Sequence, residues 1–554
     1  LKQKERKYET VRKKHVCGLR KLSVMVLSFA MVLSLLIPCG RTEAKAPAMA
    51  KKKVSVNVGK TVTVKLKNAS KKAKVTWKSK SKKIAKIAKK SKTSAKVRGV
   101  KEGSTKVTAK YVLGKTKKTL SCKVIVNGAD NTLPQSTPTQ PAVNVTPTPA
   151  QTATATPEPI QPTAAPTEVP YSWVTTWGTA EENFNASPNS MPQTLDGTTV
   201  RQIVRVTTSG KQMKLRLSNQ YGKSDVVIHS MHLAKQVEAD KSTIDTSTDT
   251  VVKAYGSEEM VIPAGEILET DPVDFSVEAL ENVAVTMYFG STPTTTSEMT
   301  GHRGARATTY QVSGNEVSTE TFSSPTTTTA WYFLADISLM SPEGSKAVVC
   351  FGDSITDGYG TDADYLGRKP DSYTRWADYF AKRLQANEGT KHISVINEGI
   401  GANSILGSYP TDAGKDRFKR DLLEHDGVGY CIILFGVNDL NALSDTSKYD
   451  QLLPEYQKMV ALCHENGIKV YGAPILPFGT SSYYSEASEQ VRTMINEWMR
   501  SSDSQMDGII DFESAVADPA NPKNVLEKYT HSDGLHPYDG YDVMADAIDL
   551  KMFE

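Results

Sequence analysis

The sequence predicts a multidomain protein in which two all-β segments precede an α/β/α domain with a doubly wound parallel sheet. Its 554 residues are enough for several domains. Residues 171–340 contain short strand-like runs separated by turn residues, which is typical of a β-sandwich. Residues 341–554 alternate apolar runs with amphipathic stretches, as the strands and helices of a doubly wound domain do.

The apolar runs of the C-terminal segment have the length and β-branched content of buried parallel strands. They lie at residues 347–351, 393–396, 431–435, 469–473 and 508–511. Amphipathic helices are predicted over residues 372–385, 451–466, 485–499 and 539–552. Open α/β sheets bind ligands at the carboxyl ends of their strands, so functional residues are expected just after these runs.

Ser354 follows the first of these runs, within the segment Gly-Asp-Ser-Ile-Thr-Asp at residues 352–357. A serine on a turn at this edge of the sheet is a candidate nucleophile, because its hydroxyl can face a bound substrate. Gly-Asp-Ser also occurs in ordinary turns. Ser354 alone therefore does not establish a function.

A nucleophilic serine needs a base, a carboxylate that orients the base, and donors for the developing oxyanion. Near the C-terminus, Asp533 precedes His536 by three residues on a loop that contains Gly534. This spacing lets the carboxylate accept the proton of the ring Nδ1 and leaves Nε2 for the serine. His531 is the alternative base nearby, but no acidic residue stands three positions before it.

Two glycine-rich segments could supply the oxyanion donors. One spans residues 397–403 and contains Gly399 and Gly401, and the other spans residues 436–439 and contains Asn438. Each follows a predicted strand, as Ser354 does. A glycine presents an unobstructed backbone N–H, and an asparagine presents an amide donor, so both suit an oxyanion hole.

In this order of motifs, residues 345–554 resemble the SGNH hydrolases, also called the GDSL esterase/lipase family, in all four of its blocks. The resemblance implies an α/β/α fold and ester hydrolysis without a metal or other cofactor. It implies the triad Ser354, Asp533 and His536. It also implies an oxyanion hole made by Gly401, Asn438 and the backbone N–H of Ser354. Gly401 is preferred to Gly399 because it aligns with the glycine before asparagine in the second block.

Other polar residues of this segment have simpler interpretations. Asp353, Asp357 and Asp439 are expected to be turn or helix-start residues rather than participants in chemistry. His392, His425 and His464 are expected at the surface or at helix ends. No cluster of His, Cys, Asp and Glu has the spacing of a metal site.

The N-terminal region predicts export and a tether. Residues 1–46 have a basic start, an apolar stretch over 22–37 and small residues after it, the pattern of a secretory signal peptide. The apolar stretch is short for a membrane span, so no stable span is expected after cleavage. Residues 128–170 are rich in Pro, Thr and Ala and are expected to form an extended linker. The protein is therefore expected to be secreted or associated with a bacterial cell wall.

Residues 47–127 are predicted to form a basic all-β module. Alternating runs such as 54–58 and 62–66, with Val-Thr-Trp-Lys-Ser at 75–79, resemble the bacterial Ig-like domains of cell-surface proteins. Residues 45–127 carry 27 Lys and Arg against one Glu, whereas residues 128–554 carry 30 against 57 Asp and Glu. Such a module favours an anionic cell-wall polymer as partner, or else it is a solvated face without one. Scarce aromatic residues argue against nucleic acid.

The function predicted from these features is ester hydrolysis on an acylated polysaccharide, with O-acetyl groups as the favoured groups to be removed. A lipase or general acylhydrolase is the alternative within the enzyme class. An alternative of another class is a non-catalytic surface or carbohydrate-binding protein on an SGNH scaffold, because a fold alone does not establish activity. The segment 173–179 resembles the β-sandwich that precedes the catalytic domain in one secreted SGNH subgroup, so residues 171–340 are expected to pack against residues 341–554.

Overall fold

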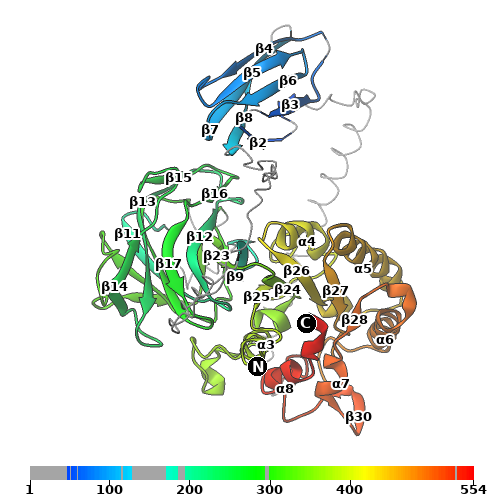
Figure 1. The fold of residues 1–554 in the computed structure, drawn as a ribbon. Helices are drawn as coiled ribbons and strands as arrows, with labels where there is room; N and C mark the ends of the chain where they lie inside the picture. Colours follow the sequence, from blue (N-terminus) through cyan, green and yellow to red (C-terminus); the bar gives the residue numbers. More distant parts are fainter. Residues whose placement is uncertain are drawn as a thin grey trace, which may run out of the picture. The chain divides into compact units, whose positions relative to one another are not determined.

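The computed structural model describes residues 47–49, 51–58, 60–70, 72–113, 116–127, 170–184, 194–293, 298–530 and 533–554. The chain divides into two compact units, Leu1–Glu158 and Pro159–Glu554 (Figure 1). The predicted signal peptide and almost all of the predicted linker lie outside the described residues. Within the ranges above, no helix combines the length and the apolar character that crossing a bilayer would require.

The described part of the first unit is a small β-sandwich of two four-stranded sheets. One sheet has the order β1–β3–β6–β5 and the other β2–β8–β7–β4. The strands are β1 (Ala48–Met49), β2 (Lys53–Asn57), β3 (Thr61–Lys67), β4 (Lys74–Ser79), β5 (Ala85–Lys90), β6 (Ser94–Gly99), β7 (Gly103–Leu113) and β8 (Thr116–Asn127). Their alternating pattern buries valines on one face and exposes lysines on the other. Trp77 and Tyr111 lie in this core, so neither ring is open to a ligand.

A second, larger β-sandwich begins the other unit. Its antiparallel sheets have the orders β14–β13–β18–β11–β20–β21 and β16–β12–β23–β9, with β15 and β17 attached to β13 and β12. The long strands are β9 (Tyr171–Gly178), β11 (Thr198–Arg205), β12 (Gly210–Ser218), β13 (Val226–Gln236), β14 (Ile244–Val251), β18 (Asn282–Ser291), β20 (Thr309–Ser313) and β23 (Leu334–Pro342). The shorter ones are β15 (Met260–Ile262), β16 (Ile267–Glu269), β17 (Val273–Val277) and β21 (Thr326–Thr328). A third, small sheet joins β10 (Glu182–Asn183), β19 (Thr300–His302) and β22 (Trp331–Tyr332). The apolar faces enclose one large core.

The C-terminal domain contains a five-stranded parallel sheet of order β25–β24–β26–β27–β28. The strands are β24 (Lys346–Gly352), β25 (Ile393–Gly399), β26 (Val428–Leu434), β27 (Lys469–Gly472) and β28 (Gly508–Ile509). All five strands are parallel, but the order in which they are added changes side at β24: β25 lies on one side of it, and β26, β27 and β28 lie on the other. The carboxyl ends of these three strands therefore flank the point at which a doubly wound sheet binds its ligand.

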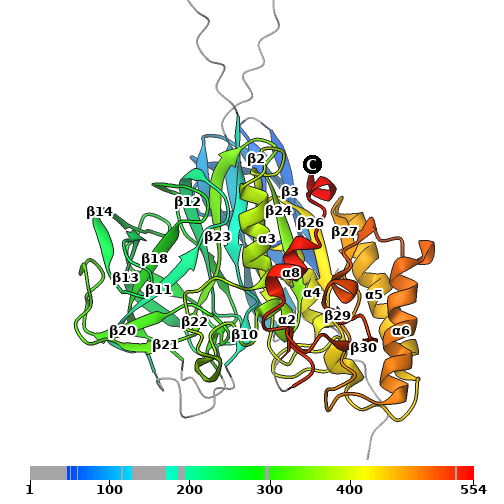
Figure 2. The same ribbon diagram turned by 90° about the horizontal axis from the view of Figure 1, so that it is seen from below.

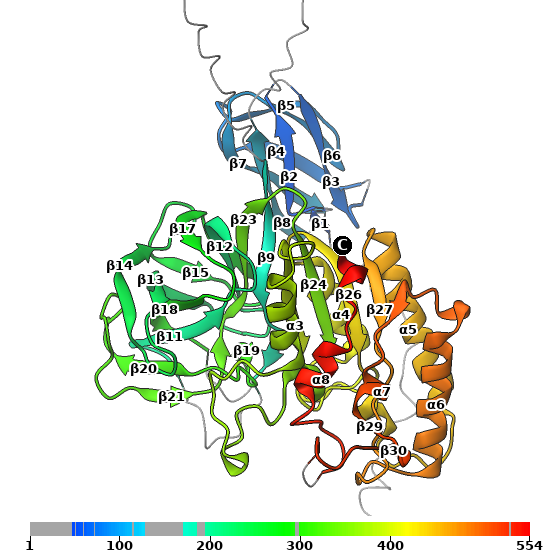
Figure 3. The same ribbon diagram turned by 60° about the horizontal axis from the view of Figure 1, so that its bottom comes forward.

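Helices cover both faces of this sheet, as Figures 2 and 3 show. Helix α3 packs against α8 on one face, and α4, α5 and α6 pack side by side on the other. The helices are α2 (Ser354–Asp357), α3 (Trp376–Gln385), α4 (Gly414–Leu423), α5 (Lys448–Glu465), α6 (Glu486–Arg500), α7 (Phe512–Val516) and α8 (Tyr541–Asp546). The predicted helix over residues 539–552 is wrong in extent, because it divides into α8 and a 3₁₀ turn at Leu550–Phe553. Helix α4 was not predicted.

The larger sandwich and the parallel sheet meet along β9 and β25. Thr179 forms a bridge with Asn397, and the hydroxyl of Ser394 donates to the carbonyl of Thr175 at 2.6 Å. Val174 on β9 packs into the hydrophobic core of the C-terminal domain. Backbone hydrogen bonding and apolar packing therefore join the two domains.

Candidate active site

Ser354 is the first residue of α2 and lies immediately beyond the carboxyl end of β24. Asp353 caps this short helix, and its carboxylate accepts a hydrogen bond from the N–H of Ile355 at 3.1 Å. Ser354 is only 6% exposed. Its Oγ lies 2.8 Å from Nε2 of His536, which comes from the loop before α8.

His536 and Asp533 form the second link of this chain of hydrogen bonds. Nδ1 of His536 lies 2.7 Å from Oδ2 of Asp533. A carboxylate accepts here, so Nδ1 carries the proton, and in the neutral ring Nε2 is then the acceptor that faces the serine hydroxyl. The structure thus brings the three predicted triad residues into one line. His531 lies outside the described residues.

The carboxylate of Asp533 is held by several donors. Its Oδ1 accepts from the backbone N–H groups of Leu535 at 2.9 Å and His536 at 3.1 Å, and the hydroxyl of Tyr538 donates to Oδ2. Partial burial alone would raise the pKa of Asp533, but hydrogen bonds from His536 and Tyr538 outweigh it and hold that pKa well below its usual range. Asp533 therefore stays ionised and keeps its orientation.

Gly401 and Gly399 differ in the use of their backbone N–H groups. The N–H of Gly399 donates to Oδ1 of Asn397 at 2.9 Å, and a Cβ on Gly399 would lie 2.2 Å from the backbone nitrogen of Asp357. Gly399 is therefore a packing position against α2. The N–H of Gly401 makes no hydrogen bond to any residue within the described ranges, so this donor remains available.

Asn438 lies on the 3₁₀ turn Val437–Leu440 that follows β26. Its Nδ2 donates to the carbonyl of Asn403 at 2.8 Å, and its Oδ1 accepts from the hydroxyl of Tyr483 at 3.2 Å. These two contacts fix which way the amide points. One N–H of the amide is then left to donate to another group.

Two acidic residues that the sequence assigned to turns do support loops around Ser354. Asp353 caps α2, and burial raises its pKa to about 7. Asp439 accepts from the N–H groups of Ile405 at 2.8 Å and Leu406 at 3.0 Å, and burial raises its pKa to about 6. Asp439 thereby ties the loop after β26 to the loop after β25.

Arg417 on α4 is a structural residue that the sequence did not reveal. Its side chain is fully buried and donates to the carbonyls of Gly352 and Glu398, each at 2.9 Å, and to Oδ1 of Asn403 at 2.9 Å. One guanidinium thus joins the ends of β24 and β25 to the loop that supports Asn438. Asp421, one turn further along α4, accepts from it at 2.6 Å.

Asp357 lies in the single turn of α2, in line with its interpretation as a turn or helix-start residue, but it is also buried against the larger sandwich. Its Oδ1 lies 3.1 Å from Nε2 of His302, and its Oδ2 accepts from Arg306 at 2.8 Å. Nδ1 of His302 donates to the carbonyl of Ala180 at 2.8 Å. Both ring nitrogens of His302 therefore face oxygen acceptors, which requires the doubly protonated ring. A Cβ on Gly401 would lie 3.5 Å from Oδ2 of Asp357.

The pKa values around Asp357 follow from this arrangement. Burial alone would raise the pKa of Asp357, but the charge of Arg306 and the contact with His302 lower it below its usual range. Burial alone would lower the pKa of His302, but the hydrogen bond to Asp357 raises it. The sandwich therefore places two cations directly behind the helix that begins with Ser354.

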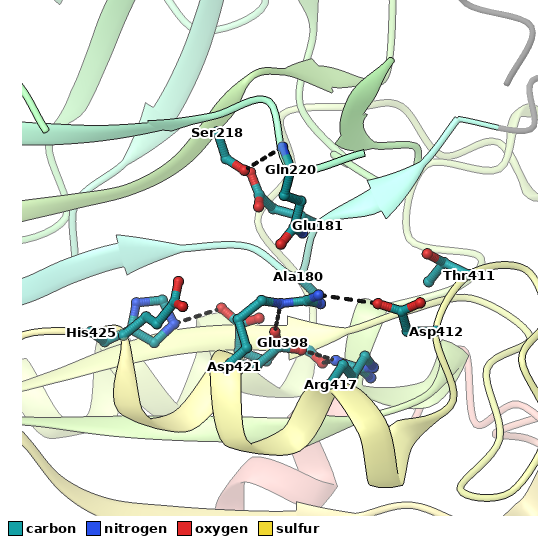
Figure 4. Close-up of polar contacts among 12 residues, drawn as sticks. Ala180, Glu181, Ser218, Gln220, Glu398, Thr411, Asp412, Arg417, Asp421 and His425 are labelled. Atoms are coloured by element: carbon teal, nitrogen blue, oxygen red, sulfur yellow. Dashed lines mark hydrogen bonds and ion pairs between the residues drawn. The ribbon is translucent and has the colours of Figure 1, made fainter. Parts of the chain in front are cut away.

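His425 was expected at the surface or at a helix end, and only the helix-end position is correct. His425 follows α4 but is buried between Asp336 of the sandwich, at 3.0 Å from Nδ1, and Glu398 of β25, at 2.9 Å from Nε2. Figure 4 shows His425 and Glu398 beside Arg417 and Asp421 in one polar layer. Burial alone would lower the pKa of His425, but the two carboxylates raise it to about 9. No local sequence signal distinguishes His425 from an exposed helix-end histidine.

The comparison with protein families concerns the C-terminal domain. Residues 350–541 match the model of the GDSL-like lipase/acylhydrolase family, so the C-terminal domain is a GDSL-like (SGNH) esterase or acylhydrolase domain. The match leaves the β-rich region before it unassigned. No curated protein matches the chain.

Three solved structures are similar to part of the chain, each with a TM-score of 0.28. A GDSL-like lipase from Bacteroides thetaiotaomicron is 22% identical, and the alignment covers 38% of this chain and 88% of that one. A lipase/acylhydrolase from Enterococcus faecalis is 22% identical, with 36% and 92% covered. A carbohydrate acetylesterase from Sinorhizobium meliloti is 18% identical, with 36% and 95% covered.

Proposed function

We propose that this protein is a serine ester hydrolase that removes O-acetyl groups from polysaccharide. The observation that carries the proposal is the continuous chain from Ser354 through His536 to Asp533, with contacts of 2.8 and 2.7 Å. A hydroxyl that donates to a neutral, carboxylate-oriented imidazole is poised to lose its proton during attack on an ester carbonyl.

The reaction follows from these contacts. Ser354 Oγ attacks the carbonyl carbon while its proton passes to Nε2 of His536, and the negative charge of Asp533 stabilises the resulting imidazolium. The N–H groups of Ser354 and Gly401 and the amide of Asn438 receive the oxyanion. His536 then returns the proton to the leaving alcohol, which leaves an acyl-enzyme. Water, activated by the same histidine, releases acetate and restores the serine.

Exposed tyrosine rings favour a sugar substrate over a lipid. Tyr359 is 41% exposed, and its ring centroid lies 4.5 Å from that of His536. Tyr409 is 68% exposed, and its backbone carbonyl accepts from Asn403 in the loop after β25. Flat amphipathic rings suit sugar faces, which are themselves apolar on one side and hydroxylated at the edge. A lipase or general acylhydrolase remains the alternative.

The proposal extends to location. The signal peptide at residues 1–46 would export the enzyme. The basic residues 47–127 would then attach it to an anionic wall polymer, near polymeric substrates. The exposed lysines of the N-terminal module support this attachment.

Two assays test the function. The full chain should hydrolyse p-nitrophenyl acetate, and Ser354→Ala should lower kcat/KM by about 10⁴-fold while the circular dichroism spectrum stays unchanged. Acetate release should then be measured from acetylated xylan, mannan, pectin and peptidoglycan. Ester hydrolysis that survives Ser354→Ala would contradict the mechanism. A protein that binds these glycans but hydrolyses no ester would support the non-catalytic alternative.

A further inference from the structure

A cavity of about 630 Å³ lies beside the candidate triad, at the junction of the larger sandwich and the C-terminal domain. Its volume is within the roughly 300–1,000 Å³ typical of ligand pockets. Tyr538 and Asp539, directly after His536 and Pro537, line it on one side. The ring centroid of Tyr538 lies 5.8 Å from that of His536, so a ring that lines the cavity lies next to the catalytic base.

Both domains contribute to the walls of this cavity. Asp240, in the exposed loop between β13 and β14, comes from the sandwich. Asp371, Ser372 and Thr374, in the segment before α3, and Tyr379 on α3 come from the C-terminal domain. The segment is attached to the sandwich, because Asp371 accepts from the N–H of Thr308 at 2.8 Å.

The backbone around the cavity is held in an unusual conformation. Asp240, Asp371 and Tyr373 have positive φ values of 53°, 67° and 50°. For a tyrosine this left-handed conformation is costly, so surrounding contacts must impose it. The guanidinium of Arg205 lies 3.5 Å above the ring of Tyr373 and supplies such a contact. The walls are therefore shaped in advance by the sandwich rather than being a loose surface loop.

The lining chemistry fits a hydroxylated ring better than an acyl chain. Carboxylates, hydroxyls and the backbone of Gly367 alternate with the rings of Tyr379 and Tyr538. The lining contains four aspartates but only two cations, Arg368 and Lys369. Arg368 is already paired with the aspartate Asp539. Hydroxyl groups can donate to this surface, whereas a sugar carboxylate would meet like charge.

We propose that this cavity is the subsite for the glycan on the alcohol side of the ester, and that it selects neutral sugars over uronic acids. The proposal rests on the function proposed above. The acetylated sugar lies at Ser354, and the chain continues past Tyr359 and Tyr538 into the cavity. Asp240 then makes the sandwich a determinant of substrate specificity.

Steady-state kinetics of the full chain test the subsite. For Asp240→Ala, the ratio of kcat/KM on acetylated xylo-oligosaccharides to that on p-nitrophenyl acetate should fall at least fivefold. For Asp240→Lys, kcat/KM on acetylated oligogalacturonides relative to the xylo-oligosaccharides should rise at least fivefold. Glu238→Ala, with the same charge change in the same loop but outside the cavity, should match the wild type. Ratios within twofold of the wild type in both Asp240 variants would overturn the proposal.

Binding to the full chain carrying Ser354→Ala separates this inference from the proposed function. Isothermal titration with unacetylated xylo- and manno-oligosaccharides should show binding that weakens at least fivefold when Asp240→Ala is added. Ester hydrolysis by the wild type without such binding would overturn the subsite and leave the esterase intact. Binding that depends on Asp240, in a protein that hydrolyses no ester, would support the subsite and contradict the proposed function.

Discussion

The two all-β regions of this chain differ in whether they bury charged side chains. In the N-terminal module, the described Lys and Arg side chains are exposed, with the exception of the half-buried Lys123. In the larger sandwich, His302 and Asp336 are buried and contact charged groups of the C-terminal domain. Exposed charge suits a partner outside the protein, whereas buried charge suits the positioning of a neighbouring domain.

The largest expected loss of activity comes from the triad in the C-terminal domain and not from either all-β region. His536→Ala should lower kcat/KM on p-nitrophenyl acetate by about 10⁴-fold, because it removes the base that faces Ser354. His531→Ala is the matched control and should stay within about threefold of the wild type. A dead His531 variant beside an active His536 variant would place the chemistry on a different residue.

A smaller but still large effect is expected where the sandwich contacts α2. His302→Leu removes the histidine partner of the buried Asp357 carboxylate. Loss of one partner of a buried ion pair typically lowers the free energy of unfolding by about 3–5 kcal/mol. We expect the helix that begins with Ser354 to shift and kcat on p-nitrophenyl acetate to fall about 10- to 100-fold. His229→Leu, at a half-exposed sandwich position paired with Glu259, serves as the control. Equal activity of the two variants would show that the sandwich does not position the nucleophile.

These first two sites differ in how far the sequence could predict them. Ser354 and the glycine-rich loops lie directly after apolar strand runs, and Asp533 stands three residues before His536, so local patterns were enough to bring them together in a prediction. His302 and Arg306 lie about 50 residues before Ser354 in another domain, and their contacts with Asp357 arise only from tertiary packing. Helix α4 was missed because charged residues outnumber its buried apolar positions, Phe418 and Leu422, and Arg417 was missed with it.

The buried contact of His425 with Asp336 of the sandwich should make the free energy of unfolding depend on pH. His425 has a pKa raised to about 9 from an ordinary 6.5, so its contribution is fully present below about pH 6.5 and is lost as the pH rises through 9. His425→Gln should lower the free energy of unfolding by on the order of 3 kcal/mol at pH 6 and by much less at pH 10.

Urea denaturation at the two pH values measures this difference. His464→Gln is the control, since His464 is exposed and pairs with Asp507 within the C-terminal domain. A deficit of His425→Gln that is the same at both pH values would show that the buried ring is not charged in the folded state.

The smallest effect on turnover is expected from the N-terminal module. A chain that begins at residue 170 should keep kcat and KM on p-nitrophenyl acetate within about twofold, because no catalytic contact described above involves residues 47–127. The isolated module, which is a compact unit with its own core, should bind teichoic acid at 50 mM salt and lose most of that binding at 500 mM. Binding that ignores salt would mean that shape, rather than exposed charge, recognises the partner.

The hydrogen bond between Ser354 and His536 joins residues that are 182 positions apart. A ribosome adds about 5–20 residues per second, so the nucleophile is made roughly 10–40 s before its base. During that interval the nascent chain holds a strand, a helix cap and a serine, but no imidazole to activate them. A nascent chain that has been made only to residue 532 therefore holds Ser354 without either of the two residues, Asp533 and His536, that form its hydrogen-bonded chain.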